Sequence, residues 1–399
     1  FDWSVEIQGY ILAASSVGLA LFQIPTGFLI RIAGGKFLYG LSLTGISIAS
    51  LFTALAACWS EYALMTLRFI HGCLETSVLP TTMILLSKWS PAQEKSKLVT
   101  CSIVGLDVGT ILGFSLSGFI SSSIGWPFIY YIFGGCELVF ALLWVYLITE
   151  DPESHPTISK EELDYINRYS LLDDHSQKED LPWKDILTSL PLWSLLIANF
   201  AVIFIFYSWI SHLPQLLNSV LHMNIVNNGM TSSLPHICAA TSTLFAGWLS
   251  DFLENKYKVS STLLRKLYIF FCLALDAVLF LVASFILESQ LVLLCILLVF
   301  FLQGFIWSAV LTNNLDLSAE YSWFIAGSIC LASAISGILG PSLNGIILGK
   351  GGLMQWKIVF YMDAAVCLIG GIVYATFGSA EDQRWGKREK KFVTDIMKG

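Results

Sequence analysis

Residues 27–36, GFLIRIAGGK, form a charged, glycine-rich loop between two long apolar segments. The same pattern, a glycine followed four residues later by a charge, returns six apolar segments further along the chain. Gly27 and Arg31 make up the first copy, and Gly247 and Asp251 make up the second. Because a feature that recurs after a fixed number of spans indicates an internal repeat, the sequence predicts two six-span halves.

The apolar segments are long enough to cross a membrane, since a hydrocarbon core of about 30 Å needs about 20 apolar helical residues. Of the 399 residues, 55% are hydrophobic and 13% charged, and the mean hydropathy is +0.71. We therefore expect an all-α membrane protein with eleven spans. The expected spans cover residues 6–30, 38–58, 62–87, 95–121, 126–148, 190–217, 227–250, 266–288, 290–312, 322–348 and 356–378.

Basic residues fall into every second gap between these spans. On this division, 19 of the 22 Lys and Arg residues lie on one side of the membrane, against Lys350 and Lys357 on the other, and Arg68 lies inside a span. Cytoplasmic loops carry the excess of basic residues in membrane proteins. The C-terminus is therefore expected in the cytoplasm and the N-terminus outside or in a lumen.

The long polar segment follows the fifth span, whereas two equal halves would place it after a sixth. We therefore expect twelve spans in a complete chain, with the first helix missing from this one. Ser159 and Glu162 form a capping box that predicts a short helix as far as about Arg168. The expected parts are a five-span half (1–149), a cytoplasmic linker (150–189), a six-span half (190–379) and a cytoplasmic tail (380–399).

Several function classes are disfavoured. The net charge of −7 and the confinement of basic residues to one membrane face indicate no nucleic-acid partner. Nine scattered cysteines form no metal-binding or disulfide pattern. With no P-loop, metal cluster or nucleophile triad, we expect neither an enzyme nor a cofactor or metal.

The two-half organisation and its repeated loop resemble the major facilitator superfamily, and several local strings narrow the resemblance to its anion transporter family. That family, solute carrier family seventeen, contains the type I sodium–phosphate cotransporters, sialin and the vesicular glutamate transporters. The match runs from Phe1 to about Trp385 and looks closest to the sodium–phosphate and organic-anion branch. The strings are FDWSVEIQGYIL (1–12), QIPxG (23–27), KWSPxxE (88–94), GWPFxYYIFG (125–134), SSLPH (232–236) and NLDL (314–317).

The third span carries Arg68, His71 and Glu75 at spacings that place all three on one stripe of a helix. Arg68 offers a charged planar fork that suits a carboxylate or phosphate. His71 and Glu75 can exchange protons and are the candidates for ion coupling. Sialin and the vesicular glutamate transporters resemble this chain at Arg68 and Glu75, but sialin has a second acid at the position of His71. The alternative is a static Arg–Glu pair that only joins helices.

Four other polar residues, two in the sixth span and two at the inner end of the ninth, lie on helices that, by the resemblance, line a central cavity, where they would bind the substrate by hydrogen bonds. His236, near the middle of the seventh span, is a further candidate to face the cavity, although a lone histidine is as often an interhelical donor. Glu137, Asp276 and Asp363 are interpreted as packing groups on peripheral helices. These further substrate-binding candidates are Asn199, Tyr207, His236, Asn313 and Asn314.

The glycines fall into two groups, one expected to pack helices together and one expected to form part of a gate. Gly105, Gly109 and Gly113 repeat at every fourth residue and predict a ridge of small residues packed against a neighbouring helix. The superfamily resemblance implies that the paired loops latch a cytoplasmic gate. The gating candidates are Gly27, Arg31, Gly247 and Asp251.

These observations predict a secondary active transporter that carries phosphate or an organic anion, urate-like or carboxylate, by alternating access. Sodium or the membrane potential would drive it. One alternative is a proton-coupled, sialin-like exporter of acidic sugars, and another is a truncated non-transporting isoform or membrane partner. We expect a monomer in the lipid bilayer, in the plasma membrane rather than a lysosomal or vesicular one, with a small anion as its substrate and Na⁺ or H⁺ as the coupling ion.

Overall fold

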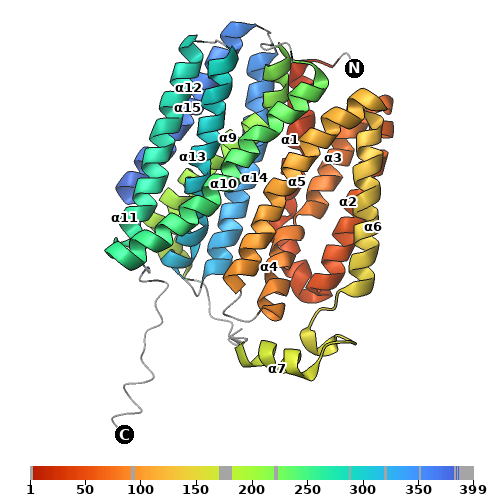
Figure 1. Ribbon diagram of the computed structural model, residues 1–399, viewed down its shortest axis with the longest axis vertical. Coiled ribbons are helices and arrows are strands. Elements are labelled where there is room, and N and C mark those ends of the chain that lie inside the picture. Colours follow the sequence, from red (N-terminus) through yellow and green to blue (C-terminus); the bar gives the residue numbers. More distant parts are fainter. Residues whose placement is uncertain are drawn as a thin grey trace.

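The computed structural model is a bundle of long helices that stand side by side (Figure 1). The structure describes residues 3–90, 95–169, 182–219, 223–286, 289–318, 321–349, 352–381, 383 and 385. Within these residues every regular element is helical, and nine helices are long and apolar enough to cross a membrane. The predicted all-α membrane fold is therefore confirmed.

Long helices also lie at the two remaining predicted spans. They are α1 (Val5–Ala33) and α10 (Ile225–Tyr257), which are not among the nine. The count of eleven spans and the division into parts therefore stay predictions. We call residues 1–149 the N-terminal half and residues 190–379 the C-terminal half.

The N-terminal half contains α1 and five further helices. Ser60 caps the N-terminus of the helix that begins at Glu61, because its hydroxyl accepts a hydrogen bond from the Ala63 amide at 3.1 Å. The five are α2 (Gly35–Trp59), α3 (Glu61–Glu75), α4 (Val78–Trp89), α5 (Lys95–Ser123) and α6 (Pro127–Leu147).

The third predicted span is interrupted between α3 and α4, at Thr76 and Ser77. Pro80 lies in the first turn of α4, where its missing N–H leaves a backbone carbonyl of the preceding turn without a helical partner. The hydroxyls at the break bond elsewhere: Thr76 donates to the Cys73 carbonyl at 2.8 Å, and Ser77 donates to Ser42 at 2.6 Å. The span is therefore two helices, with Glu75 at the junction.

The C-terminal half contains α10 and five further spans. One of these spans joins α11 (Ser261–Lys266), a π-helical turn (Leu267–Phe271) and α12 (Cys272–Ile286). The others are α9 (Leu190–Ser219), α13 (Ser289–Leu317), α14 (Ser322–Leu348) and α15 (Leu353–Phe377).

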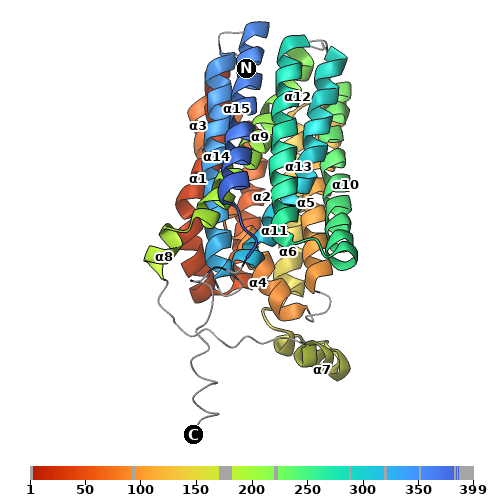
Figure 2. The same cartoon turned by 90° about the vertical axis from the view of Figure 1, so that its left-hand side faces the viewer.

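The linker contains the predicted short helix. Helix α7 (Lys160–Tyr169) begins after Ser159, whose hydroxyl accepts a hydrogen bond from the Glu162 amide at 3.1 Å. Helix α7 and α8 (Trp183–Leu187) lie at one end of the bundle (Figure 2). We call this the basic end, because Lys36, Lys88 and Lys256 also lie there; the other is the opposite end. Most of the tail, residues 386–399, lies outside the described residues.

Two helix pairs join the halves: α1 packs against α14, and α5 packs against α10. Within the C-terminal half, α9 packs against α14 and α15 and forms part of one large apolar core. Among the described residues of the N-terminal half, Ile11, Ala57 and Leu64 form a small buried cluster, and other buried hydrophobic residues, such as Leu43 and Ile46, lie outside it. The described part of this half has no helix that corresponds to α9.

The ridge of small residues predicted along α5, which includes Gly118 below the three repeated glycines, packs against a neighbour at one end only. A methyl group at Gly118 would lie 2.9 Å from the Ile225 carbonyl oxygen of α10. A methyl group at Gly105, Gly109 or Gly113 would meet no atom of the described residues within 4 Å. Spacing showed that the glycines share a face, but only the helix arrangement determines whether a neighbour covers it.

Candidate functional site

The halves touch closely toward the opposite end of the bundle. A methyl group at Gly9 of α1 would lie 2.9 Å from the Pro341 carbonyl oxygen of α14. On the other side, a methyl group at Gly229 of α10 would lie 2.7 Å from the Phe114 carbonyl oxygen of α5. Backbones approach this closely only where side chains are absent. The opposite end is therefore closed.

Other glycines of the same four helices have no such contacts. Methyl groups at Gly27 of α1, Gly109 of α5, Gly247 of α10 and Gly327 of α14 would each meet no described atom within 4 Å. The predicted gating glycines Gly27 and Gly247 therefore make no close contact with the described residues of the other half. The side chains of Arg31 and Asp251, the other two gating candidates, lie outside the described residues.

The stripe on α3 points into the space between helices. The Glu75 side chain is 46% exposed although it lies near the middle of its span, and His71 Nδ1 is 3.8 Å from its carboxylate. The charge of Arg68 acts on both residues. No ion pair joins Arg68 to Glu75 in the described part of the chain. The structure therefore brings all three together without the static pair that was the alternative interpretation.

Tyr130 on α6 is a neighbour of this stripe that the sequence analysis did not single out. The Arg68 guanidinium donates a long hydrogen bond to its hydroxyl, at 3.5 Å. Trp126, one turn earlier, packs edge-on against the Tyr130 ring at 6.2 Å. The sequence did contain a signal for Tyr130, because the GWPFxYYIFG string places a tyrosine about one turn into a predicted span.

Tyr207 of α9 extends the stripe into the C-terminal half. Its ring lies beside Gly337 of α14 and close to Ser16 of α1, and its hydroxyl is within electrostatic range of Glu75. Asn199, two turns away, is 1% exposed and donates to the Ser333 hydroxyl at 3.0 Å. Tyr207 is thus placed near the stripe, whereas Asn199 joins α9 to α14.

His236 of α10 is surrounded by three aromatic rings. Its ring centroid is 5.7 Å from Phe114, 5.8 Å from Phe206 and 5.4 Å from Phe300, and only 2% of the residue is exposed. Phe114 belongs to the N-terminal half and the other two rings to the C-terminal half. His236 therefore lies at the contact between halves rather than in an open space.

Asn313 and Asn314 lie near the basic end of α13, away from the stripe. The Asn313 amide donates to the Ser379 carbonyl at 2.9 Å. Nearby, the buried Arg265 guanidinium donates to the Asp316 carboxylate at 3.1 Å. The predicted substrate-binding set is thus divided, with Arg68 and Tyr207 close together and the other residues dispersed.

A second charged cluster ties the N-terminal half together at its basic end. The Glu150 carboxylate accepts hydrogen bonds from the Gly35 amide at 3.2 Å, the Lys36 amide at 2.6 Å and the Lys88 ammonium at 3.0 Å. Lys88 also contacts Asp151 at 2.8 Å. Burial raises the pKa of Glu150, but these donors together lower it by more. The net pKa of Glu150 is therefore below its usual value.

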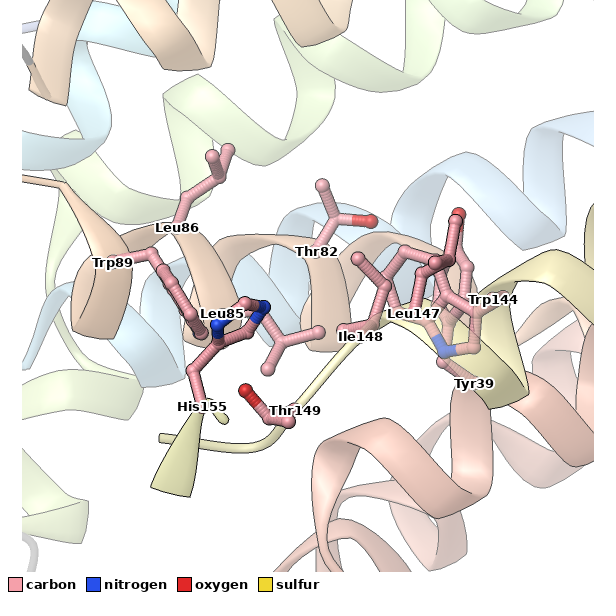
Figure 3. A pocket seen from close by; sticks show the side chains of 10 residues that line it. All are labelled: Tyr39, Thr82, Leu85, Leu86, Trp89, Trp144, Leu147, Ile148, Thr149 and His155. Carbon is pink, nitrogen blue, oxygen red and sulfur yellow. The ribbon is translucent and has the colours of Figure 1, made fainter. Parts of the chain in front are cut away.

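A cavity of about 320 Å³ lies beside this cluster, between α2, α4 and α6 (Figure 3). Its walls are largely aromatic and aliphatic, and His155 of the linker closes one side. Another cavity, of about 580 Å³, lies between α1, α3 and α14 and is lined by Met65, Thr66 and Phe69 rather than by the stripe. Neither cavity contains Arg68, His71 or Glu75. The lining of the first is Tyr39, Thr82, Leu85, Leu86, Trp89, Trp144, Leu147, Ile148, Thr149 and His155.

Comparison with known proteins identifies the family. Residues 1–341 match the Major Facilitator Superfamily. Human sialin is 31% identical over 386 residues, which cover 96% of this chain and 78% of sialin. The probable small intestine urate exporter of mouse is 32% identical over 97% of this chain and 79% of its own. Mouse sodium-dependent phosphate transport protein 3 is 32% identical over 97% of this chain and 81% of its own.

Solved structures show the same fold. A bacterial homologue of the human lysosomal transporter Spinster, in an inward-facing and occupied conformation, has a TM-score of 0.71 at 15% identity, over 94% of this chain and 89% of its own. A D-xylose–proton symporter has a TM-score of 0.69 at 13% identity, over 95% of this chain and 90% of its own. The chain therefore belongs to the Major Facilitator Superfamily and, within it, to the anion transporter family of solute carrier family seventeen. The resemblance drawn from the local strings is confirmed, as is the prediction that the chain is not an enzyme.

Proposed function

We propose that this chain is a secondary transporter that moves phosphate or an organic anion by alternating access, driven by sodium or the membrane potential. The observation that carries the proposal is Arg68: a guanidinium within a membrane span that forms no ion pair with the described residues. A charge at this depth costs about 3 kcal/mol unless it is compensated. An anionic substrate would provide that compensation, as a carboxylate or phosphate can accept two hydrogen bonds from the guanidinium. The names of two of these relatives, a probable urate exporter and a sodium-dependent phosphate transport protein, specify anions that agree with this chemistry.

The two ends of the bundle support alternating access. The close contacts at Gly9 and Gly229 close one end, while the same helices stand apart at Gly27 and Gly247. If the basic end faces the cytoplasm, as the distribution of Lys and Arg predicts, this is the inward-facing arrangement. Rocking the halves would separate the glycine contacts and bring the paired loops together. We place the transporter in the plasma membrane.

A second candidate is the proton-coupled exporter of acidic sugars. The observation that favours it is Glu75, whose carboxylate is 46% exposed beside His71 and at a break in its span. Discontinuous helices near the membrane midplane often form ion and substrate sites in transporters.

Uptake by the full chain in proteoliposomes tests the proposal. Phosphate, urate, sialate and glutamate would be supplied with sodium, proton and potential gradients in turn. We expect Arg68→Ala to abolish uptake and Arg68→Lys to lower it at least about tenfold, because a point charge cannot replace a bidentate fork. Lys184→Ala, which removes one exposed charge from α8, is the control and should transport normally. Uptake by Arg68→Ala equal to wild type would place the anion site elsewhere, and no uptake by wild type would favour the non-transporting isoform.

A further inference from the structure

Helices α3 and α6 both pack against α2, and they carry pairs of residues at matching spacings. Both run from the opposite end toward the basic end, since Met65 and Trp126 pack on one small core near their starts. Arg68 contacts Tyr130 across the gap at 3.5 Å. Seven residues further along each helix stand Glu75 and Glu137. Seven residues make nearly two full turns, about 10.5 Å, so the two carboxylates occupy the next matched level on the same faces.

The electrostatics agree with this register. The charge of Glu75 acts directly on the Glu137 carboxyl, and no hydrogen bond or ion pair holds Glu137 among the described residues. The other ionisable groups around the two carboxyls are Arg68 and His71 on α3, Tyr39 on α2 and Tyr207 on α9. Two carboxylates within electrostatic range of each other at membrane depth repel, so a bound cation is needed for both to be stably ionised.

We propose that Glu137 is a second ion-coupling residue, which together with Glu75 binds one monovalent cation, a proton or a sodium ion. The inference rests on the proposed function and gives its coupling ion a site. It also replaces the interpretation of Glu137 as a packing group, because Glu137 lies within electrostatic range of a second carboxyl, that of Glu75. Arg68, two turns away on α3, then binds the anion while the carboxyl pair binds the cation, so both sites lie on one wall of the same open space.

The test compares two transport assays in proteoliposomes of the full chain. Counterflow measures exchange of anion across the membrane without a cation gradient, whereas gradient-driven uptake needs coupling. We expect Glu137→Gln and Glu75→Gln each to lower gradient-driven uptake at least about tenfold while counterflow persists. The double variant should be no worse than either single one, because the two carboxyls act as one site. Asp107→Asn, which neutralises a carboxyl on α5 outside this pair, is the matched control and should keep coupling.

The outcomes separate this inference from the proposed function. Loss of dependence on a pH gradient identifies a proton, and loss of dependence on a sodium gradient identifies sodium. Normal gradient-driven uptake by Glu137→Gln overturns the inference even though transport remains. Additive losses in the double variant also overturn it, since they show two independent sites. If Glu137→Gln does not fold, Glu137→Asp replaces it, because aspartate retains an ionisable group. The Glu137→Asp variant should transport with altered cation dependence. Unaltered cation dependence of this variant would contradict a shared cation site. Absence of counterflow in the wild-type chain would instead contradict the proposed function itself.

Discussion

The two halves of the bundle differ in how they bury their residues. In the C-terminal half, 33% of the most apolar part of α14 and 44% of that of α15 are buried, whereas the values for α5 and α6 in the N-terminal half are 6% and 11%; α2, at 44%, is as buried as α15. Helix α9 packs against both α14 and α15 and belongs to one apolar core. Among the described residues of the N-terminal half, no helix packs in this way against both α5 and α6. Helix α9 thus provides much of the packed interior of the C-terminal half.

The difference extends to polar residues. In the C-terminal half, the indole of Trp209 donates to the buried Asp363 carboxylate at 3.0 Å and stacks on Phe280 and Phe360. In the N-terminal half, Glu75 is half exposed between helices. The Asp363 carboxylate thus has a structural partner within the packed core, whereas the exposed Glu75 carboxylate is accessible to a ligand. The interpretation of Asp363 as a packing group agrees with this contact.

Removing the centre of the larger core should have the strongest effect. Trp209→Ala deletes a fully buried ring and leaves Asp363 without its donor, so we expect a loss of about 3–5 kcal/mol in stability. Trp59→Ala is the matched control in the N-terminal half, because its side chain is 83% exposed, and it should change stability by less than about 0.5 kcal/mol. Thermal unfolding of the purified protein in detergent measures both. Equal losses would show that the two halves are packed alike.

Crowding the contact between halves should have an intermediate effect. Gly229→Ala would place a methyl group 2.7 Å from the Phe114 carbonyl, and such overpacking costs about 1–3 kcal/mol. We expect the variant to separate the halves at the opposite end and favour the other conformation. Distances between spin labels on α5 and α10 measure the shift. Gly109→Ala, with no described atom within 4 Å, is the control; an identical distance distribution for Gly229→Ala and wild type would show that this contact does not close the bundle.

The charged cluster at the basic end should have the smallest effect. The pKa of Glu150 is lower in the folded protein than its usual value of about 4.5, so its stabilisation is present above that value. It is lost as the pH falls through the lower, folded value. We expect Glu150→Gln to cost about 1 kcal/mol at pH 7 and nothing measurable at a pH below the folded value. Unfolding temperatures across that pH range test this, with the exposed Glu153→Gln as control; a cost that persists at low pH would mean that the charge is not its cause.

Local physical rules accounted for much of what the sequence predicted. Span positions follow from the length of apolar segments, α7 from the Ser159 capping box, and the stripe of Arg68, His71 and Glu75 from the period of a helix. Family membership followed from short strings, and the comparisons confirm it. Each of these depends on residues close together in the chain.

The partners of those residues were decided only by the tertiary structure. Helix spacing cannot show that Arg68 reaches Tyr130, that His236 lies among three aromatic rings, or that Gly109 faces no neighbour. It also could not show that Glu137, interpreted as a packing group, lies within electrostatic range of Glu75. The physical reason is that a helix determines which residues share a face, whereas the packing of helices far apart in sequence determines what that face meets.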